Sequence, residues 1–335
     1  MATIADRLRS EGKFIDLFAG IGGFRLALES FGLKCVFSSE WDNHAQETYR
    51  ENFGETPKGD IREIASEEIP PHNVLCSGYP CQSFSLAGKQ KGFLDETRGT
   101  LFYEVARIAD HRKPEVVFME NVGNFEVHDE GRTLKTVLRT MDEIGYDIFY
   151  EVIDSSRYGT PTARVRIYFV AFRKDLGIRS FSFPKPTDEP VRLRDVLLPD
   201  TETDGFLVKR KNMPDTRIAL ETDVFGEESS YPQPVRIGTI SYGGQGDRIY
   251  SDLGPAVTLM ADGGGAGGRT GCYLVNGRVR RLAPRECARV MTFPDSFRIV
   301  VSPTQAQRQF GNSVVVKVVR MIFGEIMKVL GNITV

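Results

Sequence analysis

Short apolar runs alternate with amphipathic stretches through the first half of the chain, and this alternation constrains the fold more than any other sequence feature. The apolar runs predict strands over residues 14–18, 34–40, 74–77, 115–119, 149–153 and 166–172. The amphipathic stretches predict helices over residues 22–30, 44–53, 100–112 and 132–144. Strands that alternate with helices are typical of a largely parallel sheet covered by helices. We therefore expect an α/β domain.

The alternation ends near residue 184, where three prolines interrupt a polar segment. Residues 191–281 are rich in glycine and lack helix–strand alternation, which predicts a smaller, irregular, β-rich domain. We place a first domain at 1–193, a second at 194–283, and a segment at 284–335 that returns to the first. Within that segment an apolar stretch predicts a core-packed helix.

Composition excludes several classes of protein. The chain has 335 residues, of which 41% are hydrophobic and 26% charged, so disordered and fibrous classes are excluded. No apolar run approaches the roughly 18 residues of a membrane span, and residues 1–13 lack the apolar core of a signal peptide. The five cysteines form no CxxC pair. We therefore expect no metal site and a reducing, cytoplasmic setting.

The formal net charge of −2 argues against a wholly basic nucleic-acid binder. One stretch departs from this balance, because residues 264–290 carry six arginines and a single acid, Glu286. Charge alone leaves two interpretations of that stretch open, a surface that contacts a polyanion and a solvated charged face.

A glycine-rich turn follows the first predicted strand, within Asp16–Phe24. Such a turn lets a ligand approach the backbone at a helix N-terminus, although it can also serve packing alone. Glu40 can accept hydrogen bonds from ribose hydroxyls, Trp41 offers a stacking face, and Asp60 can accept from the amine of adenine. Arg25 stands at the third glycine position of a dinucleotide fingerprint. The dinucleotide fingerprint therefore fails, and the sequence predicts a site for an adenosine-containing cofactor that is not a dinucleotide.

Cys81 follows the predicted strand 74–77, in a polar loop that is preceded by Pro80. A cysteine in a loop at the carboxyl end of a strand is well placed for nucleophilic attack. Cys35 and Cys76 lie inside apolar runs, where a buried and unreactive thiol is expected instead.

Six motifs, in this order, resemble those of the DNA cytosine-5 methyltransferases and together cover nearly the whole chain. They are Asp16–Gly23, Pro80–Gln82, Glu120–Val122, Arg164–Arg166, Pro284–Arg289 and Gly311–Val314. The resemblance implies a class I S-adenosylmethionine-dependent methyltransferase fold, a Rossmann-like mixed sheet with helices on both faces. It also implies that the first predicted domain carries the catalytic and cofactor-binding residues and that the second recognises the target sequence. Residues 284–335 would then form a hinge and a C-terminal helix.

The resemblance further implies transfer of a methyl group from S-adenosylmethionine to carbon-5 of a cytosine flipped out of duplex DNA. Cys81 would add to carbon-6 of the ring, which makes carbon-5 nucleophilic. Glu120 would donate or share a proton at ring nitrogen-3. Arg164, and secondarily Arg166, would contact the base carbonyl and orient the acid, although a structural ion pair is nearly as good an interpretation of Arg166.

The same resemblance assigns further residues to the cofactor and to DNA. Those for the cofactor are Phe18, Ala19, Gly20, Ile21, Gly22, Gly23, Glu40, Trp41, Asp60, Ile61, Gly78, Pro80, Leu101, Asn312, Ser313 and Val314. Those for DNA are Ser85, Lys89, Gln245, Arg248, Thr258, Gly264 and Gly265. Gln245 is expected to fill the space that the flipped base leaves, and the loop 85–98 is expected to close over DNA as a lid.

Four positions depart from the family pattern, namely Tyr79, Ala87, Thr162 and Asp262. Tyr79 keeps an aromatic ring, and Thr162 changes the pocket near the transferred methyl group. Ala87 and Asp262 lie on the DNA side, so they leave the reaction in place but put the recognition sequence, for which the resemblance suggests GCGC, in doubt. An RNA cytosine-5 methyltransferase is the main alternative, and a nicotinamide-dependent oxidoreductase and a catalytically silent DNA-binding protein are weaker rivals. We further expect a monomer without membrane contact that works beside a separate restriction endonuclease.

Overall fold

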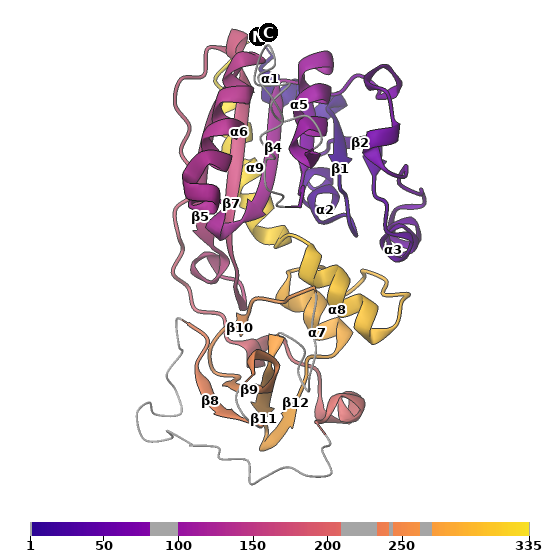
Figure 1. Cartoon of the computed structure of the whole chain (residues 1–335), viewed down its shortest axis with the longest axis vertical. Coiled ribbons are helices and arrows are strands. Elements are labelled where there is room, and N and C mark those ends of the chain that lie inside the picture. The colour runs from indigo at the N-terminus through magenta and orange to yellow at the C-terminus, as the bar shows by residue number, and fades with distance from the viewer. Residues whose placement is uncertain (1, 81–99, 209–232, 241–243, 262–269, 335) are drawn as a thin grey trace. The chain divides into compact units, whose positions relative to one another are not determined.

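The computed structural model describes residues 2–80, 100–208, 233–240, 244–261 and 270–334. Packing divides the chain into two units (Figure 1). The first unit comprises residues 1–153, 165–184 and 316–335, and the second comprises 154–164 and 185–315. Packing thus groups 284–315 with the second unit. The functional boundaries at 193 and 283 stay a prediction.

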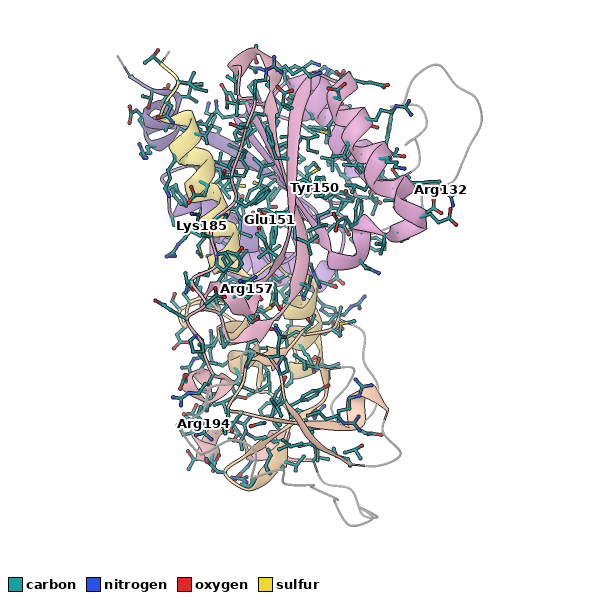
Figure 2. All side chains as sticks on the ribbon, turned by 90° about the vertical axis from the view of Figure 1, so that its left-hand side faces the viewer. Arg132, Tyr150, Glu151, Arg157, Lys185 and Arg194 are labelled. Carbon is teal, nitrogen blue, oxygen red and sulfur yellow. The ribbon has the colours of Figure 1, made fainter. Side chains whose placement is uncertain are left out.

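A six-stranded sheet forms the centre of the first unit, in the strand order β2-β1-β3-β4-β7-β5. Its strands are β1 (Lys13–Leu17), β2 (Lys34–Ser39), β3 (Val74–Ser77), β4 (Val116–Val122), β5 (Tyr146–Asp154) and β7 (Val165–Arg173). The strands β1, β2, β3 and β4 run parallel to one another, whereas β7 runs antiparallel to β4. The sheet is therefore mixed, as the family resemblance implied. Figure 2 shows Tyr150 and Glu151 on β5, at the edge of this sheet.

Helices cover both faces of the sheet. They are α1 (Ile4–Glu11), α2 (Gly23–Glu29), α3 (Asn43–Phe53), α5 (Leu101–Arg112), α6 (Arg132–Glu143) and α9 (Val316–Leu330). On one face α5 and α6 share an apolar core with β1, β3 and β4. On the other, α2 packs on α9, and Phe24 of α2 contacts Phe118 of β4 edge to face at 5.2 Å between ring centroids. None of the helices that the structure describes has the length and apolar character needed to cross a membrane.

The sequence analysis missed α1. Its surface is mostly charged, and its buried stripe consists of three residues, Ile4, Ala5 and Leu8. The signal that marks its start is the capping box of Thr3 and Asp6, in which each side chain bonds to the backbone of the other residue.

The second unit is built from short strands and short helices. Its strands are β6 (Thr162–Ala163), β8 (Arg236–Thr239), β9 (Arg248–Ser251), β10 (Ala256–Val257), β11 (Cys272–Val275) and β12 (Arg278–Arg280). Four of them form a sheet in the order β12-β11-β9-β8, and β6 pairs with β10. The α-helices are α7 (Pro284–Val290) and α8 (Pro303–Asn312), which the sequence analysis did not predict. The small, irregular, β-rich architecture itself is confirmed.

A buried ion pair joins β12 to α7. Arg280 and Glu286 are 1% and 0% exposed and make two contacts, of 2.7 and 2.8 Å. Glu286 also accepts hydrogen bonds from the backbone amides of Leu198 and Ala283. Because Arg280 is buried, it is not part of an exposed basic face. The interpretation of this stretch as a surface that contacts a polyanion was therefore wrong for that arginine.

Candidate functional site

A pocket of about 270 Å³ lies at the carboxyl ends of β1 and β2. Its lining comes from five separate segments of the first unit: Phe18, Ser39, Glu40, Trp41, Gly59, Asp60, Ile61, Arg62, Pro80 and Leu101. The structure thus brings together seven of the residues that were predicted to hold the cofactor. The three that sequence reasoning missed, Ser39, Gly59 and Arg62, are each an immediate neighbour of a predicted residue.

The turn between β1 and α2 contributes Phe18 to the lining of this pocket. Phe18, which lines the pocket, has a left-handed φ of 56°, an uncommon conformation for a side chain that is not glycine. Gly22 has a φ of 84°, and a Cβ there would lie 2.3 Å from the ring of Phe53. The turn therefore requires glycine at this position. The predicted residues Ala19–Gly23 shape the turn and begin α2.

Glu40 is held from both sides by backbone amides. Gly20 donates to its Oε2 and Asp42 to its Oε1, each at 2.8 Å. Burial raises the pKa of Glu40, and these amides oppose that shift. The carboxylate is therefore fixed at the pocket wall as a hydrogen-bond acceptor, which suits the hydroxyls of a ribose.

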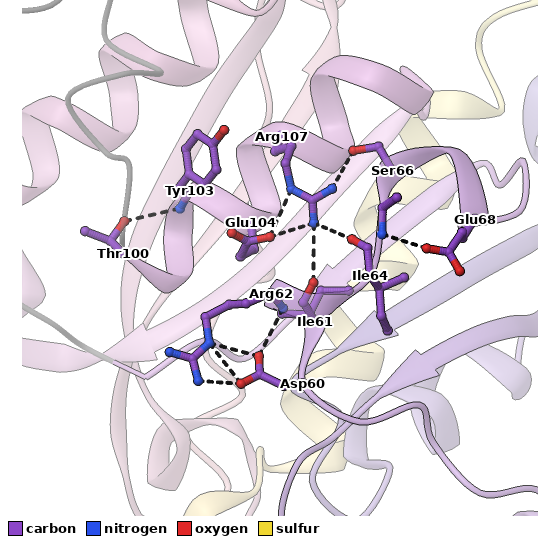
Figure 3. Close-up of polar contacts among 11 residues, drawn as sticks. Asp60, Ile61, Arg62, Ile64, Ser66, Glu68, Thr100, Tyr103, Glu104 and Arg107 are labelled. Atoms are coloured by element: carbon purple, nitrogen blue, oxygen red, sulfur yellow. Dashed lines mark hydrogen bonds and ion pairs between the residues drawn. The ribbon is translucent and has the colours of Figure 1, made fainter.

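Trp41 and Asp60 lie in the same pocket. The Trp41 side chain is 74% exposed, so one face of the indole is available for stacking. Asp60 accepts from the backbone amide of Arg62 at 3.0 Å and pairs with the Arg62 guanidinium, whose Nε lies 3.0 and 2.9 Å from its two oxygens (Figure 3). This pairing lowers the pKa of Asp60. Asp60 is therefore a charged acceptor.

The pocket fits an adenosine group. Its apolar lining includes Phe18, Ile61 and Leu101, and its acceptors Glu40 and Asp60 come from separate segments of the chain. In addition, the buried hydroxyl of Ser39 has no hydrogen-bond partner among the described residues. A buried polar atom without a partner in a pocket wall is suited to a ligand.

Glu120 and Arg166 form the second part of the site, where β4 and β7 run side by side. The Nε of Arg166 lies 3.0 Å from Oε1 of Glu120, and the two side chains are 15% and 11% exposed. A Cβ placed on Gly78 would lie 3.9 Å from Oε2 of Glu120. The acid thus lies beside the end of β3, from which the chain continues through Pro80 to Cys81.

Asn121 anchors the segment that leads to Cys81, a role that sequence reasoning missed. Its side-chain amide is buried and donates to the backbone carbonyl of Tyr79 at 2.9 Å. The ring of Tyr79 packs against Phe102 and Phe125, with centroids at 5.7 and 6.3 Å. The departure at Tyr79 therefore keeps a buried aromatic ring. Cys81 itself lies outside the described residues.

Arg164 donates hydrogen bonds within the second unit. Its guanidinium is buried and donates to the carbonyls of Leu259 at 3.2 Å, Gly311 at 3.0 Å and Ser313 at 2.7 Å. These bonds hold the backbone around Asn312–Val314. They favour a framework role for Arg164, while Arg166 is the arginine that pairs with Glu120. The expectation from the sequence put Arg164 first, and the catalytic role of either arginine stays a prediction.

The residues predicted to contact DNA are described only in part. Thr258 donates its hydroxyl to the carbonyl of Ala163 at 2.7 Å, and Arg248 begins β9. Gln245 begins a 3-10 helix (Gln245–Asp247), and its side chain is not described. Ser85, Lys89, Gly264 and Gly265 lie outside the described residues, as do the departures Ala87 and Asp262. The departure Thr162 is fully buried in β6.

The described cysteines are buried, and none of them forms a disulfide: Cys35, Cys76, Cys272 and Cys287. Burial raises the pKa of Cys35 to about 12, which makes its thiol unreactive, as was predicted. Among the residues that the structure describes, no group of three or more His, Cys, Asp and Glu side chains is arranged to hold a metal ion.

Comparison with known proteins agrees with the motifs. A profile of the family described as C-5 cytosine-specific DNA methylase matches residues 12–328. The type II methyltransferase M.HhaI of Haemophilus parahaemolyticus is 51% identical over 322 residues, which cover 96% of each chain. Within the sequence, segments 243–251 and 271–277 also resemble this HhaI enzyme in particular. The type II methyltransferase M.HpaII of Haemophilus parainfluenzae is 39% identical and covers 97% of this chain and 92% of that one.

Solved structures support the fold. The crystal structure of the S. pombe Dnmt2 methyltransferase superposes with a TM-score of 0.68 at 20% identity and covers 94% of this chain and 98% of that one. A DNA modification methyltransferase encoded in an E. coli prophage gives a TM-score of 0.66 at 23% identity, with coverage of 96% and 99%. These likenesses show the fold, while the family profile and the two relatives above show that the chain is an enzyme of the C-5 cytosine-specific DNA methylase family.

Proposed function

We propose that this enzyme transfers a methyl group from S-adenosylmethionine to carbon-5 of a cytosine flipped out of a short duplex DNA sequence. The bond that makes this possible joins Cys81 to carbon-6 of the ring. The observation that carries the proposal is the convergence of seven predicted cofactor residues on one pocket, in a chain of the cytosine-5 methylase family.

The pocket residues have separate roles toward the cofactor. Glu40 accepts from the ribose hydroxyls, Asp60 accepts from the exocyclic amine, and Trp41 stacks on the adenine ring. When bound, S-adenosylmethionine supplies an electrophilic methyl group. Asn312, Ser313 and Val314 belong to the second unit, and their role toward the cofactor rests on the family resemblance.

The chemistry begins at Cys81. Its thiolate would add to carbon-6 of cytosine, and the electron pair of the ring double bond would move to carbon-5. Carbon-5 would then take the methyl group that the cofactor supplies as its bond to sulfur breaks, with S-adenosylhomocysteine as the product. Glu120 holds a proton at ring nitrogen-3, which offsets the negative charge that develops on the ring. Arg166, 3.0 Å from Glu120, orients that acid and faces the base carbonyl. Loss of the carbon-5 proton, with water as the acceptor, then restores the double bond and expels Cys81.

The target base has to leave the duplex before this attack can occur. Gln245 fills the space that the base leaves, while Arg248, Thr258, Gly264 and Gly265 contact the DNA. The loop that carries Ser85 and Lys89 closes over the substrate. Because arginines and lysines displace counterions from phosphates, DNA affinity should fall steeply as salt rises.

The biological setting follows from the relatives. Both enzymes compared above are named type II methyltransferases. We propose the same role here, the modification half of a restriction–modification system, in a cytoplasmic monomer that acts beside a separate endonuclease. GCGC is the proposed recognition sequence.

The test is to methylate random-sequence duplex DNA with the purified protein and to map the modified cytosines by bisulfite conversion. We expect 5-methylcytosine at one cytosine of GCGC, with Cys81→Ala as the inactive control. Modification at another sequence would overturn the proposed specificity. Absence of 5-methylcytosine in DNA together with methylation of tRNA would favour the RNA methyltransferase alternative.

A further inference from the structure

Two walls of the adenosine pocket come from segments that are far apart in the chain. One wall is Asp60 with Ile61, where the short 3-10 helix η1 (Ile61–Glu63) begins. Another is Leu101, the first residue of α5. The segment that follows Ile61 continues into a second 3-10 helix, η2 (Ser66–Glu68), and none of these residues pairs in the sheet. Something other than strand pairing must therefore hold this segment against α5.

Arg107 of α5 makes that connection (Figure 3). Its Nη1 donates to the hydroxyl of Ser66 at 2.6 Å. Its Nη2 donates to the carbonyls of Ile64 at 3.0 Å and Ile61 at 3.4 Å. One guanidinium thus reaches the first residue of η1, the first residue of η2 and the link between them.

Glu104 orients this guanidinium from one turn earlier on the same helix. Its Oε2 accepts from Nε at 2.9 Å and from Nη2 at 2.6 Å. The side chains of Arg107 and Glu104 are 20% and 11% exposed, so the contact is largely shielded from water. A planar guanidinium offers five N–H groups to these acceptors, and the two on Nη2 are shared among three of them, whereas a lysine ammonium offers only three N–H groups.

We propose that Arg107 is a positioning residue of the cofactor pocket, which holds the 61–66 segment against α5 and so sets the separation of Ile61 from Leu101. It touches neither cofactor nor substrate. The inference rests on the proposed function, because it concerns the site assigned to S-adenosylmethionine. Its loss should weaken cofactor binding by relaxing a preformed pocket and should leave the chemical step largely unchanged.

The chain supplies a matched control. Arg112 also lies on α5 and also donates to this segment, through Nη2 to the carbonyl of Glu67 at 2.6 Å. Glu67 is the middle residue of η2 and follows the segment that Arg107 holds, and neither Arg112 nor Glu67 lines the pocket. Arg112→Gln therefore removes a similar bond between the same two segments without loosening the wall.

Trp41 provides the readout, because it is the single tryptophan of the chain and lines the pocket. The experiment is a titration of the full-length protein with S-adenosylhomocysteine, followed by tryptophan fluorescence. We expect Arg107→Gln to raise Kd about tenfold, the equivalent of one lost charge-assisted hydrogen bond. Arg112→Gln should stay within about twofold of the parent. With saturating S-adenosylmethionine, kcat of Arg107→Gln should stay within about threefold, while KM for the cofactor rises.

The outcomes separate this inference from the proposed function. If the parent protein shows no binding, the proposed function fails. If the parent binds but folded Arg107→Gln binds equally well, or Arg112→Gln is weakened as much, the role of Arg107 is overturned. Should Arg107→Gln not fold, Arg107→Lys and Ser66→Ala decide, because both keep a positive charge at position 107. We expect each of them to raise Kd about threefold, and an unchanged Kd in both would refute the inference.

Discussion

Buried acids serve different purposes in the two units. In the first unit, Glu120 lies at the end of β4 and pairs with Arg166, and both side chains keep some exposure, 11% and 15%. In the second, Glu286 and Arg280 are 0% and 1% exposed, and every contact that Glu286 makes is to the framework around it. The first pair is accessible to a substrate, whereas the second pair is sealed.

Both units also bury apolar side chains. The first unit packs α5 and α6 on its sheet through a cluster of 22 buried apolar side chains. Among the described residues of the second unit, Ile240, Ile249 and Cys272 form a buried cluster, and Met291 and Phe310 are buried as well. Hydrophobic burial therefore stabilises both units, and the Arg280–Glu286 pair adds a sealed polar contact to the second.

The largest expected effect on stability comes from Glu286→Gln. This change leaves the Arg280 charge buried without its partner, which should lower the free energy of unfolding by about 3–5 kcal/mol. Urea denaturation followed by circular dichroism would measure it. A loss below about 1 kcal/mol would contradict the account of the second unit.

Glu120→Gln is the matched change in the first unit. It should lower kcat by about 10²–10³, because the amide cannot hold the proton at ring nitrogen-3. Its free energy of unfolding should fall by only about 1 kcal/mol, since the pair is partly exposed. Methylation rates at saturating DNA and cofactor, together with DNA affinity, provide the check. An equal loss of rate and of DNA affinity would argue against the acid role.

Variants of Arg164 and Arg166 test the same difference between a framework role and a role in the reaction. Arg164→Gln removes donors from three carbonyls in the second unit and should cost about 2–3 kcal/mol of stability. Arg166→Gln should lower kcat roughly 10–100-fold while the melting temperature changes little. Thermal melts and single-turnover rates on both variants would settle the assignment, and the reverse pattern would restore the order expected from sequence.

Sequence could predict the pocket because parallel strands bring their carboxyl ends to one edge of a sheet. The apolar run 74–77 coincides with β3, and Glu40 and Trp41 were found from their place at the end of the predicted strand 34–40. The order of Arg164 and Arg166 could not be predicted in this way. It depends on where β7 begins and on the register that sets Arg166 opposite Val122 of β4.

The second unit was harder to predict. Arg280 stands among several arginines, and only the packed structure shows that one of them is sealed against Glu286. Charge patterns carry no information on burial, so the pair could not be distinguished from a solvated face. Likewise α7, which is seven residues long, has too few turns for a helical pattern to emerge.

The smallest expected effect comes from Thr292, which has a left-handed φ of 60° although its side chain is β-branched. This conformation is strained for threonine, so Thr292→Gly should raise the free energy of unfolding by about 1 kcal/mol. Thr292→Ala keeps a Cβ and should raise the free energy of unfolding by less. Denaturant midpoints of the three proteins give the test, and a destabilised glycine variant would show that no strain is stored there.

The account depends most on the transient bond between Cys81 and the target base. The most direct measurement incubates the protein with S-adenosylmethionine and a GCGC duplex in which 5-fluorocytosine replaces the target cytosine, because fluorine at carbon-5 blocks release of the cysteine. We predict a denaturant-resistant protein–DNA adduct that mass spectrometry maps to Cys81 and that Cys81→Ser does not form. If a preparation that methylates ordinary GCGC duplex yields no adduct, or an adduct at another residue, the proposed mechanism is contradicted.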